Sequence, residues 1–317
     1  MIALLFPGQG SQKIGMLSAF VNAFPCAKRT LNEIEDATSY KILSLTENAS
    51  IEELSKTENA QLAIFATGVL CLTILKHEYG FEIKNKCKYL AGHSLGEYTA
   101  LCASGVLSLH DASKLVKKRG ELMADACKNP EDYLMSAILG ITVTDIENIL
   151  NECQPNNGVC VIANDNSNTQ VVLSGHKNAV LSVINKITNK YPKVKNIGLN
   201  TSGAFHSPIM SNVAIALDEY LSTGSISFND FSIPVISNVT LTPMTNKDIV
   251  IDELIKQVIS RVRWRETIEL ICYDNEIDKI VEIAPGRVLS NMVKRDYNDR
   301  IVVSLDTIAH IEEFMKG

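Results

Sequence analysis

Short apolar runs alternate along the chain with longer amphipathic stretches, which is the pattern of an α/β protein. The first apolar run, Ile2 to Phe6, predicts a buried strand, and helical periodicity then dominates as far as Val106. A second apolar run, Tyr89 to Ala91, interrupts that region and predicts another strand. Helices are expected from Glu97 to Val106 and from about Leu109 to Ala126. We therefore expect a sheet whose strands are joined by helices.

The pattern changes at a polar stretch, Lys128 to Asp132, and shorter elements follow. They are predicted as a strand (Met135–Leu139), a helix (Val143–Cys153), two strands (Val159–Ala163 and Gln170–Ser174), a helix (Asn178–Thr188) and a strand (Lys193–Leu199). The order βαββαβ is that of a split ferredoxin-like unit. The α/β pattern then resumes at Ile233–Ile236, Ile251–Ile259 and Ile280–Ile283. We expect a large subdomain of residues 1–127 and 201–317 with a small subdomain, 128–200, inserted in it.

A Gly-x-Ser-x-Gly motif, centred on Ser94, lies between the strand at Tyr89 and the helix at Glu97. This context predicts a nucleophile elbow, in which Gly92 and Gly96 permit a sharp turn and leave Ser94 exposed at its tip. The first N–H groups of the helix would then face the serine hydroxyl, where a developing oxyanion needs donors. A chance Gly/Ser cluster in a loop is the alternative, and the flanking strand and helix favour the nucleophile.

A serine hydroxyl needs a base, and six histidines are available. His93 is adjacent to Ser94, where neighbouring side chains diverge, so we assign it to the support or the rim of the site. His206 follows the last strand of the insert, in a loop of small residues at the expected seam between the subdomains, where clefts form. Sequence position alone leaves His206 as either the base or a loop residue. The remaining histidines are expected at the surface.

The composition is that of an ordinary globular protein: 46% of the residues are hydrophobic and the formal net charge is −6. The charge argues against nucleic acid as a partner. Eight cysteines without metal-ligand spacing indicate neither a metal site nor a disulfide framework. The sequence has no uninterrupted run of 18 apolar residues and no signal-peptide pattern. We therefore expect neither a membrane span nor export, and a cytoplasmic protein.

Several motifs, taken in order along nearly the whole chain, resemble those of the malonyl-CoA:acyl-carrier-protein transacylases. They are Phe-Pro-Gly-Gln-Gly-Ser-Gln (6–12), Gly-His-Ser-Leu-Gly-Glu-Tyr (92–98), Lys-Lys-Arg-Gly-Glu-Leu-Met (117–123), Asn-x-Asn-Ser (164–167) with Gln-Val-Val (170–172), Gly-Ala-Phe-His-Ser (203–207), Ile-Ser-Asn-Val (236–239) and Glu-x-x-Pro-Gly-x-Val-Leu (282–289). The runs around Arg119 and His206 are similar to the discrete acyltransferases that serve trans-acyltransferase polyketide synthases. The resemblance implies an α/β-hydrolase-like core with a parallel sheet and a ferredoxin-like insert.

The resemblance also implies a role for each matching residue. Ser94 would carry the malonyl group as an ester, and His206 would be the general base and then the general acid of a ping-pong reaction. A backbone carbonyl orients the histidine in this family, and the matching position is taken as Arg263, although Arg261 stands where the family has proline. The backbone N–H groups of Gln9 and Leu95 would form the oxyanion hole.

Arg119 would bind the free carboxylate of the malonyl group, because a guanidinium offers a planar two-pronged match to a carboxylate. From the sequence alone, Lys117, Lys118 and Arg119 read as a solvated helix face, and the family match changes that interpretation for Arg119 only. The two lysines are left at the surface, where they would help to steer an acidic carrier protein.

Four further residues are expected to line the site. Gln61 matches a glutamine of the family, with Leu62 in place of the usual proline. Phe205 would fill the space that an α-methyl group needs and so favour malonyl over methylmalonyl, and a core role is equally compatible. Asn166 and Asn164 would contact the malonyl or pantetheine group, or pack the subdomains together.

The resulting hypothesis is a malonyl transfer from malonyl-CoA to the phosphopantetheine thiol of an acyl carrier protein, for a trans-acyltransferase polyketide synthase or for fatty-acid synthesis. No metal or redox cofactor is implied, since the thioester supplies the activation. The expected partners are the carrier protein and domains of a synthase, with no nucleic acid and no membrane, and the chain is expected to be a monomer. A proofreading acyl hydrolase of the same fold and a non-catalytic docking module are the alternatives.

Overall fold

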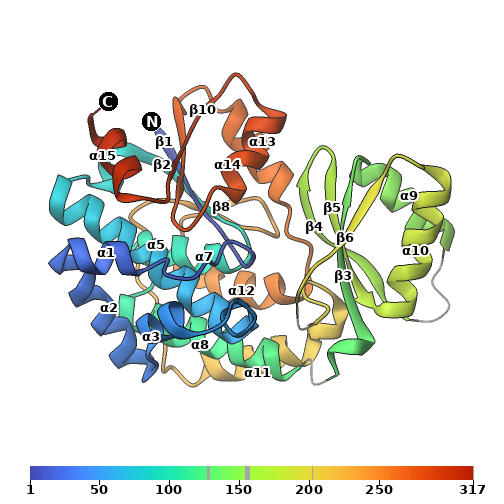
Figure 1. Cartoon of the computed structure of the whole chain (residues 1–317), viewed down its shortest axis with the longest axis horizontal. Coiled ribbons are helices and arrows are strands. Elements are labelled where there is room, and N and C mark those ends of the chain that lie inside the picture. Colours follow the sequence, from blue (N-terminus) through green and yellow to red (C-terminus); the bar gives the residue numbers. More distant parts are fainter. Residues whose placement is uncertain (127–128, 154–157, 202, 317) are drawn as a thin grey trace.

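The computed structural model describes residues 1–126, 129–153, 158–201 and 203–316, and these residues form two separate β-sheets with helices packed against them (Figure 1). The predicted boundary at residues 127 and 128 lies outside the described residues, as does Ser202 in the loop before His206.

The larger sheet has six strands in the order β10-β9-β1-β2-β7-β8. They are β1 (Ile2–Phe6), β2 (Cys87–Gly92), β7 (Val235–Ile236), β8 (Pro243–Met244), β9 (Lys279–Ile283) and β10 (Ile301–Leu305). All neighbours run parallel except β7 and β8, which pair antiparallel. The sheet is therefore mixed, and the expectation of a parallel sheet is confirmed for five of its strands; β8 is a two-residue edge strand, too short to show in the hydrophobic pattern.

Helices cover both faces of this sheet, as the alternation of apolar residues in β1 requires. Leu4 and Phe6 face one core cluster and Ala3 and Leu5 face another. The helices that share the core of Leu4 and Phe6 are α1 (Ser18–Ala23), α2 (Pro25–Thr38), α3 (Ile42–Asn48), α4 (Ile51–Leu54), α5 (Thr57–Tyr79), α7 (Leu95–Ala103), α8 (Leu109–Asp125), α11 (Ser211–Ser222), α12 (Val250–Ile259) and α15 (Ile308–Lys316). Helices α13 (Trp264–Tyr273) and α14 (Val288–Asp296) cover the opposite face, and the short α6 (Ile83–Lys86) leads into β2.

Helix α5 is the one helix among the described residues that is long and apolar enough to cross a membrane, with a mean hydropathy of 1.5. However, 83% of that stretch is buried inside the protein. Its low amphipathicity therefore reflects a position in the middle of the core, with neighbours on every side.

The smaller sheet has four antiparallel strands in the order β4-β5-β3-β6. Its elements are β3 (Tyr133–Leu139), α9 (Val143–Cys153), β4 (Cys160–Ser167), β5 (Gln170–His176), α10 (Lys177–Lys190) and β6 (Lys195–Gly198), preceded by a 3-10 turn at Pro130–Asp132. This is the predicted βαββαβ order, and the ferredoxin-like arrangement is confirmed. Helices α9 and α10 cover the outer face of this sheet (Figure 1).

Strand β4 extends to Ser167, beyond the predicted end at Ala163, and ties the smaller sheet to the rest of the chain. The N–H of Asp165 donates to the carbonyl of Val262 at 2.9 Å, and Val262 donates back to Ala163 at 2.8 Å. The buried carboxylate of Asp165 also pairs with Arg265 at 3.0 Å. Backbone pairing thus keeps the polar residues after Ala163 in the strand, whereas the hydrophobic pattern predicted that the strand ends at Ala163.

Candidate active site

Ser94 occupies the turn between β2 and α7 with φ 52° and ψ −106°, a conformation that is strained for a residue with a side chain. A Cβ on Gly92 would lie 1.9 Å from the carbonyl carbon of Gly96, and a Cβ on Gly96 would lie 2.0 Å from the carbonyl oxygen of Phe6. Both positions therefore require glycine. Asn238, after β7, accepts a hydrogen bond from the Ser94 N–H at 2.8 Å and donates to the Gly92 carbonyl at 2.7 Å. These contacts hold the turn from outside, and the geometry is that of a nucleophile elbow.

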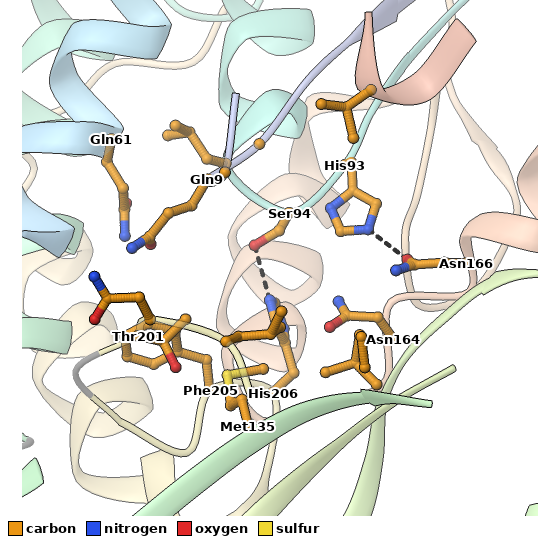
Figure 2. Close-up of a pocket in the computed structure, with 18 of the residues that line it drawn as sticks. Gln9, Gln61, His93, Ser94, Met135, Asn164, Asn166, Thr201, Phe205 and His206 are labelled. Atoms are coloured by element: carbon orange, nitrogen blue, oxygen red, sulfur yellow. Dashed lines mark hydrogen bonds between the residues drawn. The ribbon is translucent and has the colours of Figure 1, made fainter. Parts of the chain in front are cut away.

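His206 lies against this elbow, with Nε2 at 2.8 Å from the Ser94 hydroxyl (Figure 2). Its Nδ1 lies 2.8 Å from the backbone carbonyl of Gln257 in α12. Because a carbonyl only accepts, Nδ1 carries the proton, and Nε2 is left as the acceptor for the serine proton. Burial, with the nearby Arg119 cation acting in the same direction, lowers the pKa of His206 to about 3. The ring is therefore a neutral base at neutral pH.

The assignment of Arg263 as the histidine-orienting residue is wrong, since the carbonyl that faces His206 belongs to Gln257. The Arg263 carbonyl instead accepts from the N–H and the hydroxyl of Thr267, in the first turn of α13. The Arg263 guanidinium pairs with Glu266 at 2.6 Å. Position 263 is thus the N-cap of a helix, and its carbonyl bonds along that helix rather than toward the site.

Arg119 is 1% exposed, and its guanidinium lies beside Ser94. Nη1 donates to Gln61 Oε1 at 2.7 Å, and Nη2 donates to Gln257 Oε1 and to Ser94 Oγ, each at 3.0 Å. Its Nε is buried without a partner, and among the described residues the guanidinium forms hydrogen bonds to two amide oxygens and a hydroxyl but to no carboxylate. Burial lowers the pKa of Arg119, although a guanidinium stays charged in a protein. The site therefore holds a buried cation without a counter-ion, a state that an incoming carboxylate would relieve.

The two residues expected to form the oxyanion hole line the same cavity as Ser94. Leu95 is the first residue of α7, and Gln9 follows the end of β1; both line the cavity that contains Ser94. The N–H groups of Gly96 and Glu97 donate to the carbonyls of His93 and Ser94, whereas the N–H groups of Leu95 and Gln9 have no hydrogen-bond partner within the described part of the chain. Two backbone donors without a described partner thus belong to residues that line the cavity of Ser94.

The cavity around these groups has a volume of about 330 Å³. Residues of the large part of the chain, such as Gln9 and Arg119, and residues of the smaller sheet, such as Met135 and Asn164, line it. In Figure 2, Gln9 and Gln61 lie on one side of Ser94, and Asn164 and Asn166, from β4, lie on the other. Phe205 is buried and lines the cavity next to His206. The cavity thus has an apolar wall and polar groups concentrated at the reacting serine, as binding sites usually do.

His93 lines the cavity and contacts Asn166 and Trp264. Its Nε2 lies 2.8 Å from Asn166 Oδ1, and its ring meets the edge of Trp264 at 5.4 Å. Burial lowers the pKa of His93, so the ring is neutral and donates this bond. The contact joins the elbow to the smaller sheet, which is a packing role for Asn166.

The structure brings together all the residues predicted for the site except Arg263, and it adds three residues to which no role had been given. Asn238 and Glu97 both stood in motifs already singled out. Gln257 did not, but it interrupts the apolar stripe of α12 between Leu254 and Val258, and all three residues are buried. A polar residue on an apolar helix face is the signal by which the sequence could have revealed it.

Comparison with known proteins places these features in one group. Residues 3–311 match the family described as "Acyl transferase domain". The malonyl CoA-acyl carrier protein transacylase of Bacillus subtilis is 38% identical over 294 residues, which cover 93% of this chain and 90% of the relative. The transacylase of Haemophilus influenzae is 34% identical, with 99% of this chain and 98% of the relative covered.

Solved structures agree over the whole chain. The acyl-carrier-protein-S-malonyltransferase of Bartonella henselae superposes with a TM-score of 0.93 at 34% identity, covering 99% of this chain and 98% of that one. A malonyl-transacylase in complex with a type II polyketide synthase acyl-carrier protein superposes with a TM-score of 0.91 at 31% identity, covering 99% of both chains.

Proposed function

The chain belongs to the acyl transferase domain family and, within it, to the malonyl-CoA:acyl-carrier-protein transacylases, and on that premise we propose that Ser94 carries a malonyl group from malonyl-CoA to the phosphopantetheine thiol of an acyl carrier protein. The observation that carries this proposal is the buried Arg119 guanidinium, unpaired with any described carboxylate and 3.0 Å from Ser94 Oγ. An acyl group that ends in a carboxylate complements that cation; a simple fatty acyl group does not.

In the first half-reaction, His206 Nε2 takes the proton of the Ser94 hydroxyl as Oγ attacks the thioester carbonyl carbon. The N–H groups of Gln9 and Leu95 donate to the oxyanion that forms. The intermediate collapses with cleavage of the C–S bond, and the imidazolium returns its proton to the departing CoA thiolate. The malonyl group is left as an ester on Ser94, with its carboxylate on Arg119.

In the second half-reaction, the phosphopantetheine thiol of the carrier protein takes the place of CoA. The neutral His206 removes the thiol proton, and the sulfur attacks the ester carbonyl. The C–O bond to Ser94 breaks as the histidine returns the proton to Oγ. The thioester of the donor is conserved in the product, so this route needs no metal or redox cofactor.

Two residues of the cavity, Arg119 and Phe205, would select the acyl group. Arg119 favours dicarboxylic acyl groups, and the ring of Phe205 occupies space beside His206 that an α-methyl substituent would need. A steric contact of this kind discriminates by only about 1–3 kcal/mol, so we expect malonyl to be preferred over methylmalonyl rather than methylmalonyl to be excluded.

The acceptor is proposed to be a carrier protein of a trans-acyltransferase polyketide synthase. The support is the similarity of the runs Leu-Val-Lys-Lys-Arg-Gly-Glu-Leu-Met (115–123) and Ser-Gly-Ala-Phe-His-Ser (202–207) to the discrete acyltransferases of those systems. The curated relatives named above carry only the name of the transfer reaction, and a fatty-acid carrier protein fits the same chemistry. Competing the two kinds of holo carrier protein against each other for the malonyl-enzyme decides between them.

The transfer is tested by incubating the purified chain briefly with malonyl-CoA and measuring its intact mass. A malonyl adduct that holo carrier protein discharges supports the proposal. An adduct that water removes as fast without carrier protein as with it would instead indicate the acyl hydrolase. Absence of any adduct would contradict both.

A further inference from the structure

Gln257 touches all three of the groups on which the proposed chemistry depends. Its backbone carbonyl holds His206 Nδ1 at 2.8 Å, and its side-chain Oε1 accepts from Arg119 Nη2 at 3.0 Å. Its Nε2 donates to the backbone carbonyl of Ser94 at 3.0 Å. The residue is fully buried, so no water completes these bonds in its place. The direction of its amide therefore affects both the nucleophile and the cation.

The amide of Gln257 can serve these partners in one orientation only. If it were flipped, its NH₂ would face the guanidinium, which can only donate, and its oxygen would face the carbonyl of Ser94, which can only accept. The second Nε2 hydrogen is held by Glu97, whose Oε2 accepts it. Glu97 lies one helical turn after Ser94 in α7 and is itself fully buried.

Glu97 has the character of a neutral acceptor rather than of an anion. Burial raises the pKa of Glu97 to about 8. The hydrogen bond from Gln257, the backbone N–H of Asn238 and the charge of Arg119 act against this rise, and the neighbouring carboxylate of Glu253 adds to it. Its Oε1 is buried without a hydrogen-bond partner among the described residues, whereas Oε2 accepts from Gln257. A charged Glu97 would compete with the acyl carboxylate for Arg119.

We propose that Glu97 is a positioning residue that fixes the amide of Gln257 through its Oε2 and thereby directs Arg119 toward the carboxylate of the acyl group. This inference rests on the proposed function, in which Arg119 binds that carboxylate. Glu97 contacts neither substrate nor the reacting atoms, and its effect passes through the Gln257 side chain.

The test compares Glu97→Leu, which removes the acceptor, with Glu97→Gln, which keeps a neutral acceptor in the same place. Rates of Ser94 acylation by malonyl-CoA and by acetyl-CoA are measured by intact mass at pH 7, and near-UV circular dichroism establishes that each variant is folded. Glu97→Leu should lower the malonyl-to-acetyl ratio by roughly tenfold or more, as expected for a lost buried hydrogen bond to a charged network. Glu97→Gln should retain the wild-type ratio. A folded Glu97→Leu with the wild-type ratio would overturn the proposal.

The pH profile gives a second readout that a purely structural role would not affect. Glu253, Arg119 and Tyr98 are the charged or titratable groups that act on Glu97, and His206 lies across Gln257 from it. Burial raises the pKa of Tyr98 to about 12 and lowers that of His206 to about 3, so neither titrates between pH 7 and 9. The malonyl-to-acetyl ratio of the wild type should fall as the pH passes 8, whereas that of Glu97→Gln should not. Parallel pH profiles would contradict the proposal.

Failure of the proposed function is recognised separately. If Arg119→Ala leaves the ratio unchanged, or if the wild type forms no malonyl adduct, the carboxylate role of Arg119 fails. Labelling of Ser94 by a neutral fluorophosphonate then tests Glu97 without any acyl carboxylate. Because Gln257 also holds the Ser94 carbonyl, Glu97→Leu should slow this labelling several-fold and Glu97→Gln should not. Equal labelling rates would overturn the role of Glu97.

Discussion

The Ser94 hydroxyl lies between a base and a cation. Its oxygen accepts from Arg119 and is 2.8 Å from His206 Nε2, so its proton points to the histidine. The same guanidinium that polarises the free hydroxyl is available to the acyl carboxylate once the serine is esterified. The Arg119 side chain thus couples the reactivity of Ser94 to the selection of the acyl group.

Replacing Arg119 by alanine separates these two roles. Malonyl transfer should fall by at least about a hundredfold, since a buried carboxylate loses its hydrogen-bonded partner, whereas acetyl transfer should stay within about tenfold of the wild type. Acylation rates with the two CoA esters measure the difference. Lys117→Ala, two residues earlier on α8 and only partly buried, is the matched control and should change neither rate. Equal losses for malonyl and acetyl would refute the carboxylate role.

The protonation state of His206 predicts a flat pH profile. Because burial lowers its pKa to about 3, the neutral base form is present throughout the range above that value and is lost only as the pH approaches it. Ser94 acylation should therefore keep its rate from pH 7 down to pH 5. An ordinary histidine of pKa about 6.5 would lose roughly nine-tenths of its base form by pH 5.5. An inflection near pH 6.5, in rates measured by rapid quench and intact mass, would contradict the buried neutral base.

At the residue scale, motifs led to the residues that act through their side chains. Ser94, His206 and Arg119 each stand in a recognisable run of residues. The carbonyl that orients His206 has no such signature, because every residue has a carbonyl and only the path of the backbone decides which one faces the ring. That path brings α12, and not the segment at Arg263, beside the histidine.

At the element scale, β2 and α7 can approach each other so closely only because Gly92 and Gly96 have no side chains. Strand and helix meet so closely that the carbonyl carbon of Gly96 lies 1.9 Å from the place that a Cβ of Gly92 would take. The strain of Ser94 is tolerated because Asn238 and these close contacts surround the turn.

Alanine at Gly92 should therefore destabilise the fold by more than about 3 kcal/mol, because backbone atoms cannot move aside as a flexible side chain can. Gly198→Ala, in the exposed edge strand β6 with no atom within 4 Å of the new Cβ, is the control and should stay within about 0.5 kcal/mol. Urea unfolding measures both. A Gly92→Ala protein as stable as the wild type would show that the junction is looser than described.

Most elements could be predicted because burial alternates with the period of a helix or a strand. The helix Val143–Cys153 and the strand Ile2–Phe6 were predicted with the observed bounds. Strand β4 was predicted too short, because its last residues are polar and turn toward a cavity and a second backbone segment that no local pattern reveals. The edge strand β8 was missed because it has only two residues.

At the scale of the whole molecule, the charge is unevenly distributed. The net charge is −6, yet no Asp or Glu occurs from residue 166 to residue 217. Exposed lysines lie in α10, in the segment after it and at the start of β6. The residues directly after β6, Leu199 to Thr201, line the catalytic cavity. A cationic surface therefore borders the cavity to which an acidic, phosphate-bearing carrier protein must deliver its thiol.

Reversing the charge at two of these lysines, Lys193→Glu with Lys195→Glu, should slow malonyl transfer to holo carrier protein by about tenfold at low salt, because steering is lost. The maximal rate of Ser94 acylation should not change. Lys84→Glu is the control, since Lys84 lies in α6, before the start of β2, whereas the elbow follows the end of that strand. Stopped-flow transfer at several salt concentrations measures the effect. A salt dependence identical to that of the wild type would place the docking surface elsewhere.

The most direct test of the account is intact-mass measurement of the wild type and Ser94→Ala after brief exposure to malonyl-CoA, followed by holo carrier protein. We predict a single malonyl adduct on the wild type, none on Ser94→Ala, and discharge of the adduct only when the carrier protein is added. An adduct that persists on Ser94→Ala, or its absence from the wild type, would contradict the assignment of Ser94 as the acyl-carrying nucleophile.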